Sequence, residues 1–164
     1  MGSIQIGGAF FFERCDKNGR VISRHFAKNG LTTPGLNHAL DVIARQGSQS
    51  TWKIGLIDDE NFDAVSVDDT MSSHAGWTEV TDYSEANRPL WGPGVVTGKL
   101  AVNSAHVAFT MTAEKTVKGM FLVSENTKGG TTGILLCTGI FDAEALMLPT
   151  EVYKGFYRLS AEGR

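Results

Sequence analysis

The sequence predicts an all-β protein with one short helix, folded as an antiparallel β-sandwich or jelly-roll-like domain with an N-terminal hairpin arm. Short segments of alternating or continuous apolar residues recur along the chain, and turn residues separate them. Nineteen glycines against four prolines indicate many tight turns. Only one segment shows helical spacing, so strands and helices do not alternate as they do in a parallel α/β sheet.

Length and composition predict one domain with a modest core. The chain has 164 residues, of which 41% are apolar, slightly below the usual share in globular proteins. It has neither an apolar run long enough to span a bilayer nor a signal-peptide pattern at its start, so we expect no membrane partner. Cys15 and Cys137 lack metal-binding spacing and predict two free thiols, in a protein assembled in a cytoplasm.

The net charge of −3 is unevenly distributed and is too mild to indicate nucleic-acid binding. Residues 1–50 contain six Lys/Arg and three Asp/Glu, whereas residues 51–164 contain nine and fifteen. A mildly basic first third on an acidic body would orient the protein on a partner. Chance clustering of surface charge is the alternative.

Residues 1–33 are predicted to form an arm with a β-hairpin. A strand over Ile4–Phe12 precedes an Asn-Gly turn within Asp16–Arg20, and Val21–Phe26 returns. Three adjacent phenylalanines cannot share one strand face, because side chains alternate. Either they belong to the domain's own core, or the strand is a partner-binding edge that adds to a neighbour's sheet. The candidate interface residues in this strand are Ile4, Ile6, Phe10, Phe11 and Phe12.

Residues 34–46 are predicted to form an amphipathic helix that covers the sheet of a domain spanning 34–164, continuous with the arm. Thr33 is suited to cap the helix, and Pro34 lies where its missing N–H costs nothing. Apolar residues from Leu36 to Ala44 follow a helical stripe, and Gly47 supplies the stop.

The rest of the chain is predicted to be β-structure almost to its end. Residues expected in the core are Trp52, Trp77, Val107, Phe109 and Phe121, with the two tryptophans closing the sandwich. The expected strands are Trp52–Ile57, Trp77–Val80, Lys99–Val102, Ala105–Thr112, Thr116–Val123, Ile134–Phe141 and Val152–Leu159.

Leu90 and Trp91 form a second candidate interface. They follow Pro89 and precede Gly92-Pro93-Gly94, so Trp91 would be presented on a stiff loop. Tryptophan is strongly enriched at binding hot spots. The alternative has Trp91 folded inward.

The acidic stretch Asp58–Asp69 offers oxygen ligands of the kind that calcium prefers. Counted from Asp59, however, Ala64 occupies the glycine position of a calcium loop and Thr70 the closing glutamate position. We therefore predict a solvated loop, with no metal and no cofactor.

His74 lies beside serines and acids, so the residue types needed for a Ser/His/Asp triad are present near it in the sequence. The chain contains no Gly-x-Ser-x-Gly elbow, and a turn histidine bonded to nearby backbone is the simpler interpretation. We therefore predict a non-enzymatic protein without catalytic residues.

Several motifs between residues 35 and 141 resemble a family of small virion proteins encoded by tailed bacteriophages. The most distinctive is the block from Asp69-Thr70-Met71 to Trp77-Thr78-Glu79. The others are Gly35-Leu36-Asn37-His38-Ala39-Leu40-Asp41, Trp52-Lys53-Ile54-Gly55-Leu56-Ile57-Asp58, Tyr83-Ser84-Glu85, Arg88-Pro89, Lys118-Gly119-Met120-Phe121 and Lys128-Gly129-Gly130-Thr131-Thr132-Gly133.

This resemblance implies a structural virion protein, most like a capsid cement or decoration protein. Such a protein is assembled in the host cytoplasm, binds the major capsid protein on the capsid exterior and forms homo-oligomers. A neck or tail component is one alternative. Another is a receptor- or carbohydrate-binding β-sandwich, with the Asp58–Asp69 loop between Trp52 and Trp77 as its site.

Overall fold

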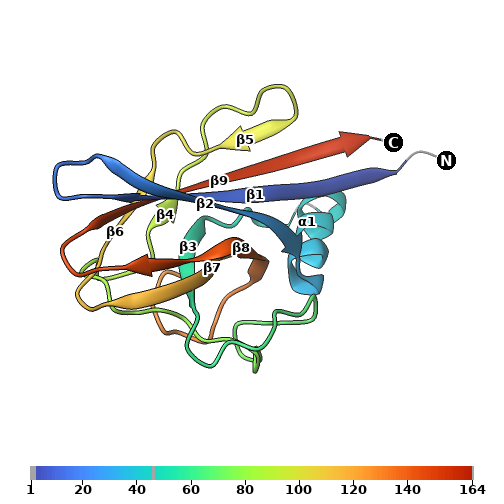
Figure 1. The fold of residues 1–164 in the computed structure, drawn as a ribbon. Coiled ribbons are helices and arrows are strands. Elements are labelled where there is room, and N and C mark those ends of the chain that lie inside the picture. The colour runs from blue at the N-terminus through green and yellow to red at the C-terminus, as the bar shows by residue number, and fades with distance from the viewer. Residues whose placement is uncertain (1–2, 46, 164) are drawn as a thin grey trace.

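A computed structural model describes residues 3–45 and 47–163, and within these ranges it confirms the all-β class with one short helix (Figure 1). Position 46, predicted as the last helical residue, lies outside the described residues. The segment predicted as a strand at Trp77–Val80 makes only an isolated bridge, between Glu79 and Ile57. The elements are β1 (Ile4–Cys15), β2 (Val21–Leu31), α1 (Thr33–Arg45), β3 (Trp52–Asp58), β4 (Leu90–Trp91), β5 (Leu100–Val102), β6 (Val107–Thr110), β7 (Lys115–Val123), β8 (Leu135–Met147) and β9 (Val152–Gly163).

The strands form one connected antiparallel sheet in the order β4-β3-β7-β8-β2-β1-β9-β5, with β6 also paired to β9. Figure 1 shows the sheet curled on itself, with β1, β2 and β9 lying over β3, β7 and β8. The interior between these two parts holds the core. Because the strands join in one sheet, the finer sandwich or jelly-roll description stays a prediction.

The N-terminal hairpin lies in the middle of the sheet and is not a free arm. From Gly8 onward β1 is bonded to β2 on one side and to β9 on the other. Phe10 and Phe12 point inward and are fully buried, and Phe12 stacks on Tyr153 with ring centroids 5.6 Å apart. Their prediction as interface residues is therefore wrong, because a strand with two neighbours places alternate side chains in the core.

Trp91 also lies in the core, where it helps to bring the two edges of the curled sheet together. Its indole Nε1–H donates to Asn103 Oδ1 at 2.8 Å, and its ring meets Tyr157 edge-on. Backbone bonds from Gly94 to Val102 and from Ser104 to Gly92 continue the closure. The prediction of Trp91 as an exposed interface residue is wrong, since only 4% of it is exposed.

The predicted core residues lie where the sequence indicated, with one partial exception. Trp77, Val107, Phe109 and Phe121 are buried, whereas Trp52 is half-buried and packs against the core from the side. Val107 and Phe109 belong to the main cluster, and Trp77 and Phe121 belong to a smaller one on the other face of β3 and β7.

Helix α1 packs on β8 near the start of that strand, but its apolar stripe faces outward. Thr32, one residue before the predicted cap, accepts the Gly35 amide at its hydroxyl. A Cβ atom at Gly35 would lie 2.2 Å from the Leu136 carbonyl oxygen, so only glycine permits this approach. Leu40 and Ile43 are 62% and 72% exposed. Among the described residues, no helix is long and apolar enough to cross a membrane.

Candidate functional site

The long excursion between β3 and β4, residues 59–89, contains the most distinctive sequence motif and is pinned to the sheet at several points. Backbone bonds join Asp58 to Thr78 and Val80 to Leu56. Another runs from the Thr33 amide to the Val67 carbonyl and ties the excursion to the start of α1. The excursion is therefore an ordered part of the domain.

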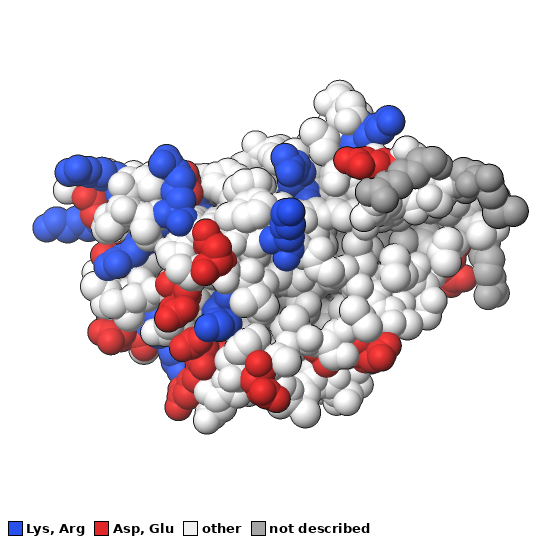
Figure 2. All heavy atoms as spheres, turned by 45° about the vertical axis from the view of Figure 1, so that its right-hand side comes forward, with Lys and Arg blue, Asp and Glu red and all other residues white. Residues whose placement is uncertain are grey.

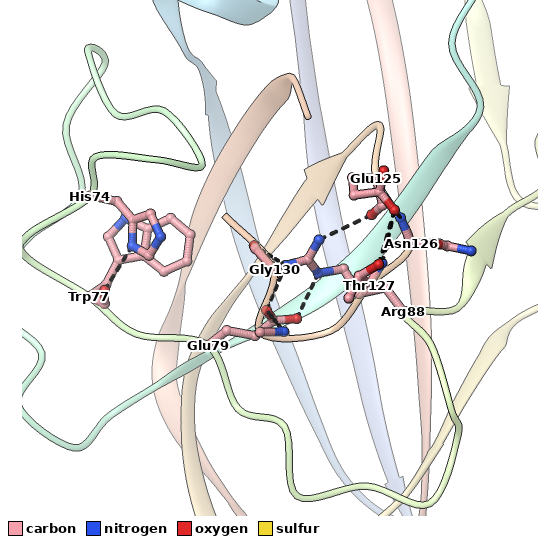
Figure 3. A network of polar contacts seen from close by, with 9 residues as sticks. His74, Trp77, Glu79, Arg88, Glu125, Asn126, Thr127 and Gly130 are labelled. Carbon is pink, nitrogen blue, oxygen red and sulfur yellow. Dashed lines mark hydrogen bonds and ion pairs between the residues drawn. The ribbon is translucent and has the colours of Figure 1, made fainter. Parts of the chain in front are cut away.

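Glu79 and Arg88 form a buried ion pair at the base of this excursion. Arg88 Nε donates to Glu79 Oε1 at 2.8 Å, and Nη2 donates to Oε2 at 2.7 Å. The arginine side chain is 0% exposed and the glutamate 6%. Figure 3 shows the carboxylate and guanidinium facing each other in this two-point arrangement, which is the strongest geometry available to such a pair.

The same two side chains bind the loop between β7 and β8. Arg88 Nη1 donates to the Glu125 carbonyl at 3.1 Å, and Nη2 donates to that of Gly130 at 2.9 Å. The Gly129 amide donates to Glu79 Oε2 at 2.7 Å. We call Glu79, Arg88 and these three backbone groups the Glu79–Arg88 latch. Four of the five N–H groups of the guanidinium are matched, so the latch has little capacity left for an anionic ligand.

Aromatic rings enclose the latch. Trp77 and Phe121 contact each other with ring centroids 5.1 Å apart, and the Arg88 guanidinium lies 5.5 Å from the Phe121 centroid. Lys128 Nζ donates to the Tyr83 carbonyl at 2.6 Å and lies 4.5 Å from that ring's centroid. Burial raises the pKa of the Tyr83 hydroxyl far above its ordinary value. The latch is thus a buried node that packs against the Phe121 ring.

Five of the seven motifs quoted for the resemblance lie at or beside this node. The sequence separates them by as much as 50 residues, yet they contact one another through Glu79, Arg88, Phe121 and Lys128. They comprise residues 69–79, 83–85, 88–89, 118–121 and 128–133. Their contacts hold the excursion of residues 59–89 against the loop between β7 and β8.

His74 has the turn role that the simpler interpretation assigned to it. Its ring stacks on Trp77 with centroids 4.0 Å apart, and Nδ1 lies 2.9 Å from the Trp77 carbonyl oxygen (Figure 3). A carbonyl can only accept, so Nδ1 carries the proton. A hollow of about 250 Å³ lies beside His74 and is also lined by Glu79 and Gly129.

The carboxylates of the acidic stretch are held by the protein's own donors. Asp58 is buried and accepts Lys115 Nζ at 3.0 Å, and this bond raises the pKa of Lys115. Asp69 Oδ2 accepts the Trp77 indole N–H at 2.9 Å, and Asp68 accepts the Thr33 hydroxyl at 2.9 Å. Among the described residues, no three His, Cys, Asp or Glu side chains are grouped to hold a metal ion.

The remaining candidate interface residues are dispersed. Ile4 and Leu90 are 77% and 58% exposed, and Ile6 is half-buried. They lie on β1 and β4, at different parts of the sheet. Phe11 is 36% exposed and points away from the core, opposite to its neighbours Phe10 and Phe12. Of the predicted set, only Phe11 lies in the middle of an open sheet face.

Sequence reasoning missed the partners of Phe11 on that face and the latch itself. Phe26 and Phe156 flank Phe11 in register, and Glu79 and Arg88 pair across nine residues of loop. An available signal was strand alternation, which places Phe26 and Phe156 opposite the inward residues of β2 and β9. No local sequence pattern predicts the latch, because its partners lie in loops.

Neither a comparison with protein-family models nor one with curated protein sequences finds a match to this chain.

Proposed function

We propose that this chain is a non-enzymatic structural virion protein that binds the outer capsid surface of a tailed bacteriophage and stabilises the shell. The observation that supports this best is the Glu79–Arg88 latch. Five of the seven motifs that resemble the phage family lie at or beside it, and polar groups of three of them bond to one another there. Polar groups that bond to one another and to backbone in this way fix the shape of the surrounding loops.

A pre-organised surface suits repeated docking on a shell. The latch and the Asp69–Trp77 bond order the excursion of residues 59–89 before any partner arrives. Ordering in advance reduces the conformational entropy lost on binding. Many copies on one particle then act together, so that modest contacts to the major capsid protein sum to strong attachment. A homo-oligomer would multiply these contacts further.

The direct test uses shells of the phage that encodes the chain, purified without this protein. Added protein should co-sediment with them to a saturating, symmetry-related copy number and should raise the temperature at which they break open. Shells that neither bind the protein nor gain heat resistance would contradict the proposal. Recovery of the chain in purified tails but not in heads would assign it to the neck or tail instead.

A further inference from the structure

A row of aromatic side chains crosses the outer face of β2, β1 and β9. Phe11 of β1 is paired in register with Phe26 of β2 and with Phe156 of β9. The rings of Phe11 and Phe26 are 5.1 Å apart and inclined by 58°. Directly opposed residues of adjacent strands lie on the same sheet face, so all three rings point away from the core.

Cations stand on both sides of this row. Ala9 lies two residues before Phe11 in β1, on the same sheet face. It is paired with Lys28 of β2 and Arg158 of β9, which are both exposed. The Arg158 guanidinium lies 5.7 Å from the Phe11 ring centroid. The small Ala9 side chain leaves room for these two long side chains to lie over the sheet.

Glu13 lies two residues after Phe11 in β1, again on the same face, and is paired with Arg24 of β2 and Lys154 of β9. Glu13 accepts Arg24 Nε at 2.9 Å, and Asp142 of β8 accepts the Phe26 amide of β2 at 3.4 Å. The surface therefore has four cations against two carboxylates, on a chain whose net charge is −3. We call the three rings and four cations the aromatic–basic face.

Figure 2 shows an uneven distribution of charged side chains on the side of the molecule that it presents. Lys and Arg side chains gather along the top, over the part of the sheet formed by β1, β2 and β9, and Asp and Glu side chains predominate in the lower left. The basic excess that the sequence shows in residues 1–50 is therefore partly concentrated on one sheet face, where β9 adds Lys154 and Arg158 to it.

We propose that the aromatic–basic face is the surface by which the protein docks onto an acidic protein surface, that of the capsid shell; this inference rests on the proposed function. Aromatic and arginine side chains at the centre of a patch are the composition of interface hot spots. A surplus of cations selects a partner patch rimmed by carboxylates, which steers encounter and rejects basic surfaces.

The dimensions of the face fit repeated, weak docking. Three register rows span about 14 Å along the strands, and three strands span about 10 Å across them. The product of these spans is about 140 Å², far below the about 800 Å² per partner of a stable single interface. One copy should therefore bind weakly, and attachment should depend on many copies bound to one shell.

Single-stranded nucleic acid also binds aromatic rings flanked by cations, but this face suits it less. Stacking needs open ring faces. Arg158 lies near the Phe11 ring, and Phe26 and Phe156 are half-buried. A protein surface, which contacts ring edges and guanidinium groups together, matches this geometry better.

The test measures co-sedimentation of point variants with shells that lack the protein. Phe11→Ala should weaken binding about tenfold or more, as expected for a hot-spot aromatic. Lys28→Glu and Arg158→Glu should weaken it comparably, and both should reduce its dependence on salt. Matched controls are Ile43→Ala, an exposed apolar truncation on helix α1, and Lys17→Glu, the same charge change in the hairpin turn; both should bind like the unmodified protein.

The outcomes separate this inference from the proposed function. Failure of the unmodified protein to bind shells would overturn both. Normal shell binding by all three face variants, with unchanged thermal unfolding, would overturn the inference alone. The inference would also be overturned if Leu90→Ala lost shell binding while Phe11→Ala bound normally. A labelled 20-nucleotide poly-dT strand is the remaining probe: binding abolished by the same face variants would reassign the face to nucleic acid.

Discussion

The Glu79–Arg88 latch and the aromatic–basic face both combine arginine with aromatic rings, but they use these groups in opposite ways. In the latch, the guanidinium is 0% exposed and meets a carboxylate and two carbonyls. On the face, Arg158 is exposed and its guanidinium lies near the Phe11 ring. The first arrangement satisfies its own charges, and the second leaves charge and apolar area for a partner. Burial thus separates a structural arginine from a candidate binding arginine.

Breaking the latch should produce the largest effect. Arg88→Met leaves Glu79 buried without its partner, so we expect a loss of about 3–5 kcal/mol in the free energy of unfolding. Urea unfolding at neutral pH measures this loss. The double variant Glu79→Gln with Arg88→Met should recover much of it, because no unpaired charge remains. A loss below about 1 kcal/mol for Arg88→Met would show that the pair contributes little.

Two adjacent phenylalanines sharpen the contrast between interior and face. Phe12→Ala empties a fully buried site and should cost about 3–5 kcal/mol, whereas Phe11→Ala removes a part-exposed ring and should cost about 1 kcal/mol or less. Thermal and urea unfolding of both variants provide the comparison. Equal losses would mean that Phe11 is a core residue and would weaken its assignment to a docking surface.

A smaller, pH-dependent effect should come from Glu151. The hydrogen bond from Arg14 lowers its pKa, so its stabilisation is complete above the unfolded-state pKa of about 4.3 and is lost as pH falls through the lower folded-state value. Glu151→Gln should cost about 1 kcal/mol at pH 7, since the pair is part-buried. The difference from the unmodified protein should shrink below pH 4.

The exposed pair between Glu13 and Arg24 provides the matched control for this pH series. Arg24 is 73% exposed, so Glu13→Gln should change stability by less than about 0.5 kcal/mol at pH 7. A Glu151→Gln difference that persists unchanged at pH 3 would contradict the assignment to its ionised carboxylate.

The smallest expected effect concerns the two thiols, which should not react with thiol reagents in the native protein. Cys15 and Cys137 are free and buried, and burial raises the pKa of Cys137 to about 11. At pH 8 only about one thiol in a thousand is ionised at that pKa. A colorimetric disulfide reagent should therefore react only as fast as the protein opens. Reaction within seconds in native buffer, as in the urea-unfolded control, would show that a thiol is accessible.

Periodicity and turn chemistry predicted the helix and most of the strands, but not the Trp77–Val80 segment, which makes only an isolated bridge, nor the direction in which the helix faces. The Asn-Gly turn places Gly19 at a φ of 81°, as the hairpin prediction required, and Val107 with Phe109 on one strand face are both buried. The apolar stripe of α1, which faces outward, shows what periodicity alone does not predict. Leu40 and Ile43 indicated a covering face, yet the close contact of Gly35 with Leu136 sets the orientation of the helix.

The sequence by itself determined the all-β class, the hairpin, the helix and most of the core residues, because these depend on local spacing and on the alternation of side chains along a strand. Strand order was decided only by the tertiary structure. By placing β1 between β2 and β9, the fold buried Phe10 and Phe12 and aligned Phe11 with two distant rings. Separately, the course of the excursion between β3 and β4 brought Glu79 and Arg88 against the β7–β8 loop. These are contacts between residues far apart in the chain, and no local pattern encodes such contacts.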